Sequence, residues 1–125
     1  MLMPQIMPST HRLPKTARLS SSLAIEDLFK RGSSFHKGSL RFYYIPSEHT
    51  QVLFMAPKRV YKKAVDRNRA KRLLREAFRT TDSKPSQHFH LGIIIVKPID
   101  LMDAARIRKW VNEGLTELYA HFKVW

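Results

Sequence analysis

One apolar run limits the possible folds of this chain more than any other stretch. The residues HLGIIIVKP, at positions 90–98, are continuously apolar over a short length and end at a proline. Such a run is typical of a β-strand that is buried on both faces. At 125 residues, the chain is long enough to bury one core around that strand and too short for two. The sequence therefore predicts a single domain with a sheet at its centre.

The first half of the chain predicts a short helix and then strands. The helix is predicted over about 22–31. The serines before it serve as caps, and Gly32 ends it. The runs SLRFYYIP (39–46) and QVLFMAP (51–57) are rich in aromatic and β-branched residues and read as strands. SSFH, just after Gly32, is a candidate for an additional short strand. Because only the short stretch PSEHT joins 39–46 to 51–57, the simplest pairing of these two strands is an antiparallel hairpin.

Two longer helices are predicted in the second half. The first carries an apolar stripe of helical period, formed by Ala70, Leu73, Leu74, Ala77 and Phe78. The second begins after Asp100 and has one apolar side, formed by Ile107, Trp110, Val111, Leu115, Leu118 and Phe122.

The predicted order of elements is therefore α-β-β-α-β-α, with one extra strand possible. This order indicates an α+β, two-layer sandwich of a small mixed sheet with helices. The strand at 51–57, the helix after it and the strand at 90–98 form a βαβ crossover, so these two strands should be parallel. Residues 1–16 lack periodicity and contain three prolines, so we expect a flexible N-terminal arm ahead of a domain over 17–125. The arm has no charged region of the kind that opens a signal peptide.

Charge and composition narrow the classes of partner. The chain has 23 Lys and Arg against 10 Asp and Glu, a net charge of +13 and a pI near 10.5. A polyanion would relieve the self-repulsion of such a domain, and nucleic acid is the commonest one, ahead of an anionic membrane. The absence of cysteine excludes disulfides and thiolate metal sites and fits the cytoplasm. No segment approaches the roughly 18 apolar residues of a membrane span.

The positive charge is concentrated between positions 58 and 79. Ten of these 22 residues are basic and two are acidic. At 100° per residue, Asn68, Arg72, Arg75 and Arg79 fall within an arc of about 60° on the side opposite Leu73 and Ala77. A solvated helix normally mixes charge signs, because like charges four residues apart repel each other. We therefore favour a nucleic-acid-binding surface over a merely solvated helix, and the arginines suit phosphate contacts and stacking on bases.

A strand beside this helix offers aromatic rings. In RFYYI (41–45), alternation places Tyr43 on the opposite face of the sheet from Phe42 and Tyr44. Exposed rings next to a basic helix would form a platform on which unpaired bases stack. The alternative is that these rings belong to the core, which fits at least one face of the strand.

Other functions have weaker support in the sequence. His88 and His90 have no third ligand nearby to complete a metal site, and no self-contained hydrolytic site is visible. A sequence-specific DNA binder would mix more Asn and Gln readers into the arginine face. An anionic-membrane helix would need the Leu-Ala-Phe stripe that the core uses. We therefore expect neither a DNA nor a membrane partner, while a general structured-RNA-binding or ribosome-associated protein remains the alternative.

The segments PKRVYKKAV and DRNRAKRLLREAF, within 57–78, closely resemble the signature of the bacterial ribonuclease P protein component. The resemblance covers roughly residues 16–122 and implies a ribosomal-protein-like fold with an extra strand. It implies the protein subunit of a ribonucleoprotein endoribonuclease that removes the 5′ leader of precursor tRNA. The catalytic RNA, together with Mg²⁺, would perform the hydrolysis, and the protein would be a monomer in that complex with no catalytic or metal-binding residue of its own.

The resemblance also implies which residues bind RNA. The family signature falls on Arg67, Asn68, Arg69, Lys71, Arg72 and Arg75. From the same basic segment we add Lys58, Arg59, Lys62, Lys63 and Arg79. The cleft for the leader would include Phe29, Tyr43 and Ile25, and the last of these stands where the family has an aromatic residue.

Overall fold

The structure, a computed structural model, describes residues 17–81 and 88–123. These residues form three helices and four strands: α2 (Ser22–Arg31), β1 (Ser33–Lys37), β2 (Leu40–Pro46), β3 (Gln51–Met55), α3 (Ala64–Arg79), β4 (Phe89–Ile95) and α4 (Ala104–Lys123). The order confirms the predicted α+β fold, including the extra strand, and α2 has the predicted bounds. The predicted arm at 1–16 lies outside the described residues.

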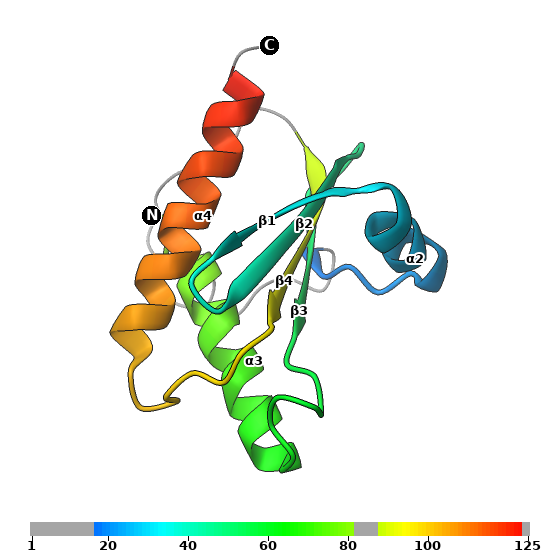
Figure 1. Ribbon diagram of the computed structural model, residues 1–125. Coiled ribbons are helices and arrows are strands. Elements are labelled where there is room, and N and C mark those ends of the chain that lie inside the picture. The colour runs from blue at the N-terminus through cyan, green and yellow to red at the C-terminus, as the bar shows by residue number, and fades with distance from the viewer. Residues whose placement is uncertain (1–16, 82–87, 124–125) are drawn as a thin grey trace, which may run out of the picture.

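The four strands form one mixed sheet in the order β1-β2-β4-β3. β4 pairs antiparallel with β2 and parallel with β3, which confirms the predicted crossover through α3. α3 and α4 cover one face of the sheet, while α2 lies on the other side (Figure 1). We call this second side the α2 face of the sheet. The chain reaches the sheet through Arg18, which bridges to Val52 in parallel at the outer edge of β3.

β4 is the buried strand that the apolar run predicts. Leu91, Ile93 and Ile95 are fully buried in the core beneath α3 and α4. On the α2 face, Ile94 is buried, and the nearest side-chain atom to Gly92 belongs to Leu28 of α2. A strand covered in this way can be apolar at every position because neither face meets water.

The predicted hairpin between 39–46 and 51–57 is wrong. β4 lies between β2 and β3, so these two strands do not pair with each other. Residues 47–50 cross over the end of β4, a distance of two strand spacings or roughly 10 Å, which four residues can span. β4, which has the longest apolar run, takes an interior position because it can fill both faces of the sheet.

The hairpin that does form joins β1 to β2. Lys37 pairs with Leu40, so the turn consists of Gly38 and Ser39. Gly38 has a φ of 60°, in the left-handed region where glycine is favoured. A Cβ at this position would also overlap the ring of Trp110 on α4.

α3 and α4 pack on the sheet through the apolar sides that their sequences predict. In α3, Ala70, Leu74, Ala77 and Phe78 are buried, and Leu73 packs against the core. In α4 the buried set is Ile107, Val111, Leu115, Leu118 and Tyr119, with Trp110 packed beside it. The side chain of Phe122 lies outside the described part of the chain. The core on this face leaves the opposite side of α3 free to meet solvent.

Candidate nucleic-acid interface

The side of α3 that points away from the core carries the predicted arc of polar and basic residues. Asn68 and Arg72 are exposed, while Arg75 and Arg79 are partly covered. We call these four residues the α3 cationic face. They lie opposite the buried residues Ala70, Leu74 and Ala77, as helical periodicity requires. The helix therefore separates its core side from its charged side.

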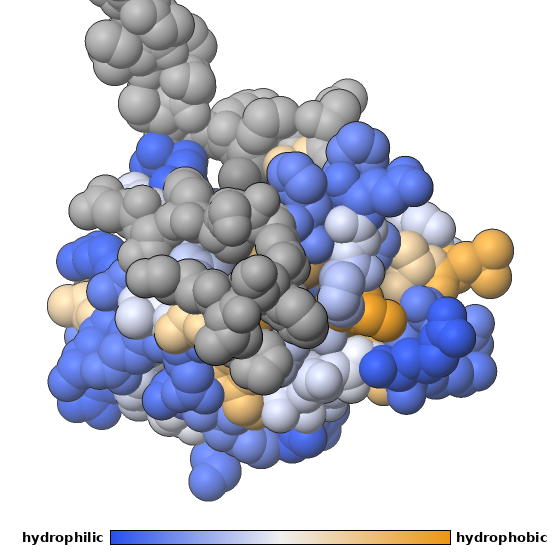
Figure 2. Space-filling model, turned by 90° about the horizontal axis from the view of Figure 1, so that it is seen from above, coloured by the Kyte–Doolittle hydropathy of each residue, from blue (hydrophilic) through white to orange (hydrophobic). Residues whose placement is uncertain are grey.

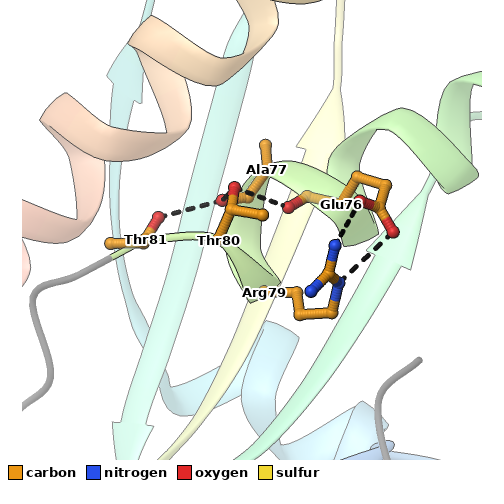
Figure 3. Close-up of polar contacts among 5 residues, drawn as sticks. All are labelled: Glu76, Ala77, Arg79, Thr80 and Thr81. Atoms are coloured by element: carbon orange, nitrogen blue, oxygen red, sulfur yellow. Dashed lines mark hydrogen bonds and ion pairs between the residues drawn. The ribbon is translucent and has the colours of Figure 1, made fainter. Parts of the chain in front are cut away.

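Arg79 differs from the rest of the α3 cationic face because it already has a carboxylate partner. Its Nη2 lies 2.6 Å from Oε1 of Glu76, and its Nε donates to Oε2 at 3.3 Å. The pair sits at the carboxyl end of α3, where the side chains of Thr80 and Thr81 donate to helix carbonyls (Figure 3). The Glu76 carboxylate raises the pKa of Arg79. This end of the arc consequently presents less net charge than the sequence suggests.

Arg75 lies at the junction of α3 and β3. Its Cζ is 6.0 Å from the ring centroid of Phe54, which is the geometry of a cation–π contact. Burial lowers its pKa, and the neighbouring charges of Arg18 and Arg72 lower it further. The charges of Arg18 and Arg72 therefore act on Arg75 beside the outer edge of the sheet. Sequence reasoning missed Arg18 as a site residue, because its approach to α3 depends on the bridge to Val52.

Two arginines of the Arg-Asn-Arg motif point in different directions. Nη1 of Arg67 donates to the backbone carbonyls of Tyr61 and Lys62, at 3.0 and 2.8 Å. Arg67 therefore fixes the basic loop that precedes α3. Nη2 of Arg69 lies 3.6 Å from Sδ of Met102, on the flank of α3 toward α4. The motif combines a loop clamp, an exposed amide at Asn68 and a cation on another side of the helix.

The loop fixed by Arg67 presents further cations. Lys58, Arg59, Lys62 and Lys63 are all exposed, and Lys71 is half-buried on α3. Among the described residues, the ion pairs of segment 58–79 involve one basic side chain, that of Arg79. Most of the predicted cations are therefore available to an anionic partner.

On the α2 face of the sheet, Tyr43 contacts Phe29. Their ring centroids are 4.8 Å apart and their planes are inclined by 83°, an edge-to-face arrangement. A side chain at Gly92 would contact Cβ of Tyr43 and the ring of Phe29, and Ile25 is half-buried one turn earlier on α2. Apolar side chains are also visible at the edge of the molecule where α2 lies (right in Figure 2), consistent with Leu23 of α2 being 79% exposed.

The other rings of RFYYI belong to the core, as the alternative interpretation proposed. Phe42 is fully buried and stacks on Phe35 with centroids 5.0 Å apart, and Tyr44 meets the same phenylalanine. Tyr43 alone of the three faces α2. A second residue missed by sequence reasoning is Arg41, whose Cζ lies 5.4 Å from the Tyr43 ring centroid.

The histidines at the start of β4 contact hydroxyl groups. Nε2 of His90 shares a hydrogen bond with the Ser47 hydroxyl at 3.0 Å, and Nδ1 of His88 shares one with the Thr50 hydroxyl at 3.1 Å. Burial lowers the pKa of His90. Over residues 17–81 and 88–123, no group of three or more His, Cys, Asp or Glu side chains is placed to hold a metal ion. The helices in the same part of the chain are too short or too polar to cross a membrane.

Comparisons with known proteins identify the family and the fold of this chain. The Ribonuclease P family model matches residues 13–119. The ribonuclease P protein component of Nitrosomonas eutropha is 34% identical over 113 residues, covering 87% of this chain and 90% of that protein. The corresponding protein of Nitrosomonas europaea is 33% identical over 101 residues, covering 76% and 81%.

Two solved structures share the fold. The RNase P protein of Staphylococcus aureus has a TM-score of 0.68 at 19% identity, with 82% of this chain and 94% of that one covered. The Thermotoga maritima protein has a TM-score of 0.59 at 22% identity, with the same coverage. The match to the family model and the identity to the two Nitrosomonas proteins establish that this chain belongs to the family of bacterial ribonuclease P protein components, the protein part of the ribonucleoprotein that matures the 5′ end of tRNA.

Proposed function

We propose that the protein binds the catalytic RNA of ribonuclease P with the α3 cationic face and the basic loop before α3. The observation that carries this proposal is the row of cations on α3, of which only Arg79 has a carboxylate partner among the described residues. Self-repulsion between Arg72, Arg75 and Arg18 is relieved when RNA phosphates approach. If six to eight phosphates are engaged, the logarithm of the binding constant falls with the logarithm of the salt concentration at a slope of roughly −4 to −7.

The second binding surface in this proposal is the α2 face of the sheet, which takes the 5′ leader of precursor tRNA. Phe29 and Tyr43 supply aromatic surface for an unpaired base, and stacking tolerates any base sequence. Ile25 adds apolar contact without stacking. Binding the leader increases affinity for the substrate over the product, which no longer carries the leader.

We assign the phosphodiester hydrolysis to the RNA partner. The part of the chain that the structure describes offers no ligand set for Mg²⁺, so we place the ion mainly on the RNA and derive no step of the protein through it. The protein would act as a monomer within the complex, and we expect it in the cytoplasm. Because its cations hold RNA segments together, its effect on the cleavage rate should be largest when Mg²⁺ is low.

Reconstitution with a bacterial ribonuclease P RNA tests the proposal. We expect the protein to accelerate leader removal at low Mg²⁺ and to bind that RNA in preference to duplex DNA or anionic vesicles. Equal cleavage rates with and without the protein would contradict the proposal and leave a general RNA-binding protein as the better description.

The leader surface has its own test. Tyr43→Ala should weaken binding of precursor tRNA by about 1 to 3 kcal/mol and leave mature tRNA unaffected. Tyr43→Phe keeps the ring and serves as the matched control. An equal loss for both RNAs would mean that Tyr43 acts only in packing.

A further inference from the structure

Arg41 is held in a fixed position beside Tyr43. The antiparallel register of β1 and β2 places His36 opposite Arg41 and Ser34 opposite Tyr43. Nη2 of Arg41 donates to the Ser34 hydroxyl at 3.0 Å, and Nη1 lies 3.1 Å from Nε2 of His36. These two hydrogen bonds orient the guanidinium with its Cζ 5.4 Å from the Tyr43 ring centroid.

Folding stability gives little reason for an arginine at this position. Its Nε is buried and has no hydrogen-bond partner within residues 17–81 and 88–123, a condition that costs stability. Within the described residues, no carboxylate pairs with its charge. The acidic residues of α2, Glu26 and Asp27, pair instead with Lys30 and Arg31 of the same helix.

The outer end of the guanidinium keeps donors for a ligand. Each Nη atom carries two hydrogens, so a single hydrogen bond to Ser34 or His36 leaves one hydrogen on each. Both of these hydrogen bonds lie at the exposed surface of the protein. Paired donors in a planar, permanently charged group suit the oxygens of a phosphate.

We propose that Arg41 binds a backbone phosphate of the 5′ leader, next to the nucleotide whose base contacts Tyr43. This inference depends on the proposed leader surface and adds a charged contact to its aromatic one. The arginine anchors the sugar-phosphate chain at the β1 side of Tyr43, while Phe29 bounds the ring on the α2 side. The leader is thereby held by one charge and one ring at a fixed spacing.

Substitutions at Arg41 separate its charge from its packing. Arg41→Met keeps an unbranched side chain over Tyr43 and removes the charge and the donors. Arg41→Lys keeps the charge and N–H donors at a single nitrogen but loses the planar pair of donors. With the reconstituted holoenzyme, we expect Arg41→Met to weaken precursor tRNA binding about tenfold, with mature tRNA unchanged. The salt slope for the precursor should become shallower by about 0.7, the amount expected for one single-strand phosphate. Arg41→Lys should lose less affinity and keep the slope.

Arg106→Met is the matched control. Arg106 also lies over an aromatic ring, with its Cζ 5.9 Å from the Trp110 centroid, but it is on α4 and pairs with Asp103. We expect this substitution to leave the affinity for precursor tRNA and the affinity for mature tRNA both unchanged. If Arg41→Met and Arg106→Met change precursor binding equally, the effect is one of net charge and the proposal is overturned.

Replacing single leader phosphates by a neutral analogue shows which phosphate Arg41 contacts. A series of leaders is made in which each leader carries a single methylphosphonate, at a different position in each. At one position, this neutral group should weaken binding to the wild-type protein about tenfold and should not weaken binding to Arg41→Met any further. If no position shows this coupling to Arg41, the assignment of Arg41 is overturned. It is also overturned if the loss of precursor affinity in Arg41→Met depends on the identity of the leader bases. If Tyr43→Ala weakens precursor binding in the same assay, the leader surface itself stands and only the Arg41 contact fails.

Discussion

The hydroxyl of Tyr61 is hydrogen-bonded to both backbone groups of Ile99. It accepts from the Ile99 amide at 2.7 Å and donates to the Ile99 carbonyl at 2.8 Å, and both residues are buried. Tyr61 belongs to the basic loop before α3, and Ile99 follows β4. One hydroxyl therefore ties the loop that carries four exposed cations to the segment leaving the central strand. Arg67 holds the same loop from within α3.

Tyr61→Phe should destabilise the protein by about 1 to 3 kcal/mol, because the amide and the carbonyl of Ile99 both lose their partner in a buried place. Urea unfolding at neutral pH measures the change. Tyr119→Phe is the control, since no hydrogen bond is found for its hydroxyl among the described residues, and it should change stability by no more than about 0.5 kcal/mol. Equal effects of the two substitutions would show that the Tyr61 hydrogen bonds contribute nothing.

Gly114→Ala should lower stability although alanine is the better helix former. A Cβ at Gly114 would overlap the ring of Phe42, which is fully buried and stacked on Phe35. Overpacking costs about 1 to 3 kcal/mol, which exceeds the gain in helix propensity of about 1 kcal/mol. Thr116→Ala, at an exposed position of the same helix, gains propensity without a clash. The melting temperature should therefore fall for Gly114→Ala and rise slightly for Thr116→Ala, and a rise in both would contradict the packing argument.

Local patterns in the sequence predicted the helices, the buried strand and the parallel direction of β3 and β4, whereas the order of the strands in the sheet was not predictable from them. The periodicity of α3 and the apolar run of β4 are properties of single segments. The insertion of β4 between β2 and β3 depends on contacts between segments far apart in the chain, and a short connection alone favoured the hairpin. Pairing between β1 and β2 had no sequence signal beyond Gly38 and its turn.

The candidate site divides in the same way. Helical geometry predicted the outward arc on α3, and strand alternation predicted that Tyr43 and Phe42 lie on opposite faces of β2. Arg18 and Arg41 are positioned through strand pairing, with Val52 and His36 respectively, and the pattern of a single segment does not predict such pairing. The ion pair of Arg79 could have been anticipated from the spacing of three residues to Glu76, a standard geometry for helical ion pairs.

Arg72→Ala combined with Arg75→Ala should weaken binding to the catalytic RNA by a few kcal/mol, because two phosphate contacts are lost. The salt slope should become shallower by about 2, and the melting temperature should stay near that of the wild type. A filter-binding titration over a range of salt concentrations measures both affinity and slope. Arg106→Ala combined with Arg108→Ala removes the same charge from α4 and should leave the slope unchanged. Equal losses for the two double variants would indicate that overall charge, rather than the α3 cationic face, determines RNA binding.

The stability of the protein should decline above pH 10, and Tyr119 should contribute to the decline. Burial against the core raises the pKa of Tyr119 to about 12, whereas the pKa in the unfolded chain is near 10. Between these values the unfolded state loses the phenolic proton and the folded state keeps it, so the free energy of unfolding falls as the pH rises, by up to about 1.4 kcal/mol per pH unit. Tyr119→Phe has no proton to lose, so its stability should fall less steeply than that of the wild type over this window. Urea-unfolding series of both proteins at pH 8 to 11 measure the difference. If the free energy of unfolding falls equally with pH in the two proteins, Tyr119 ionises as easily in the folded state as in the unfolded one.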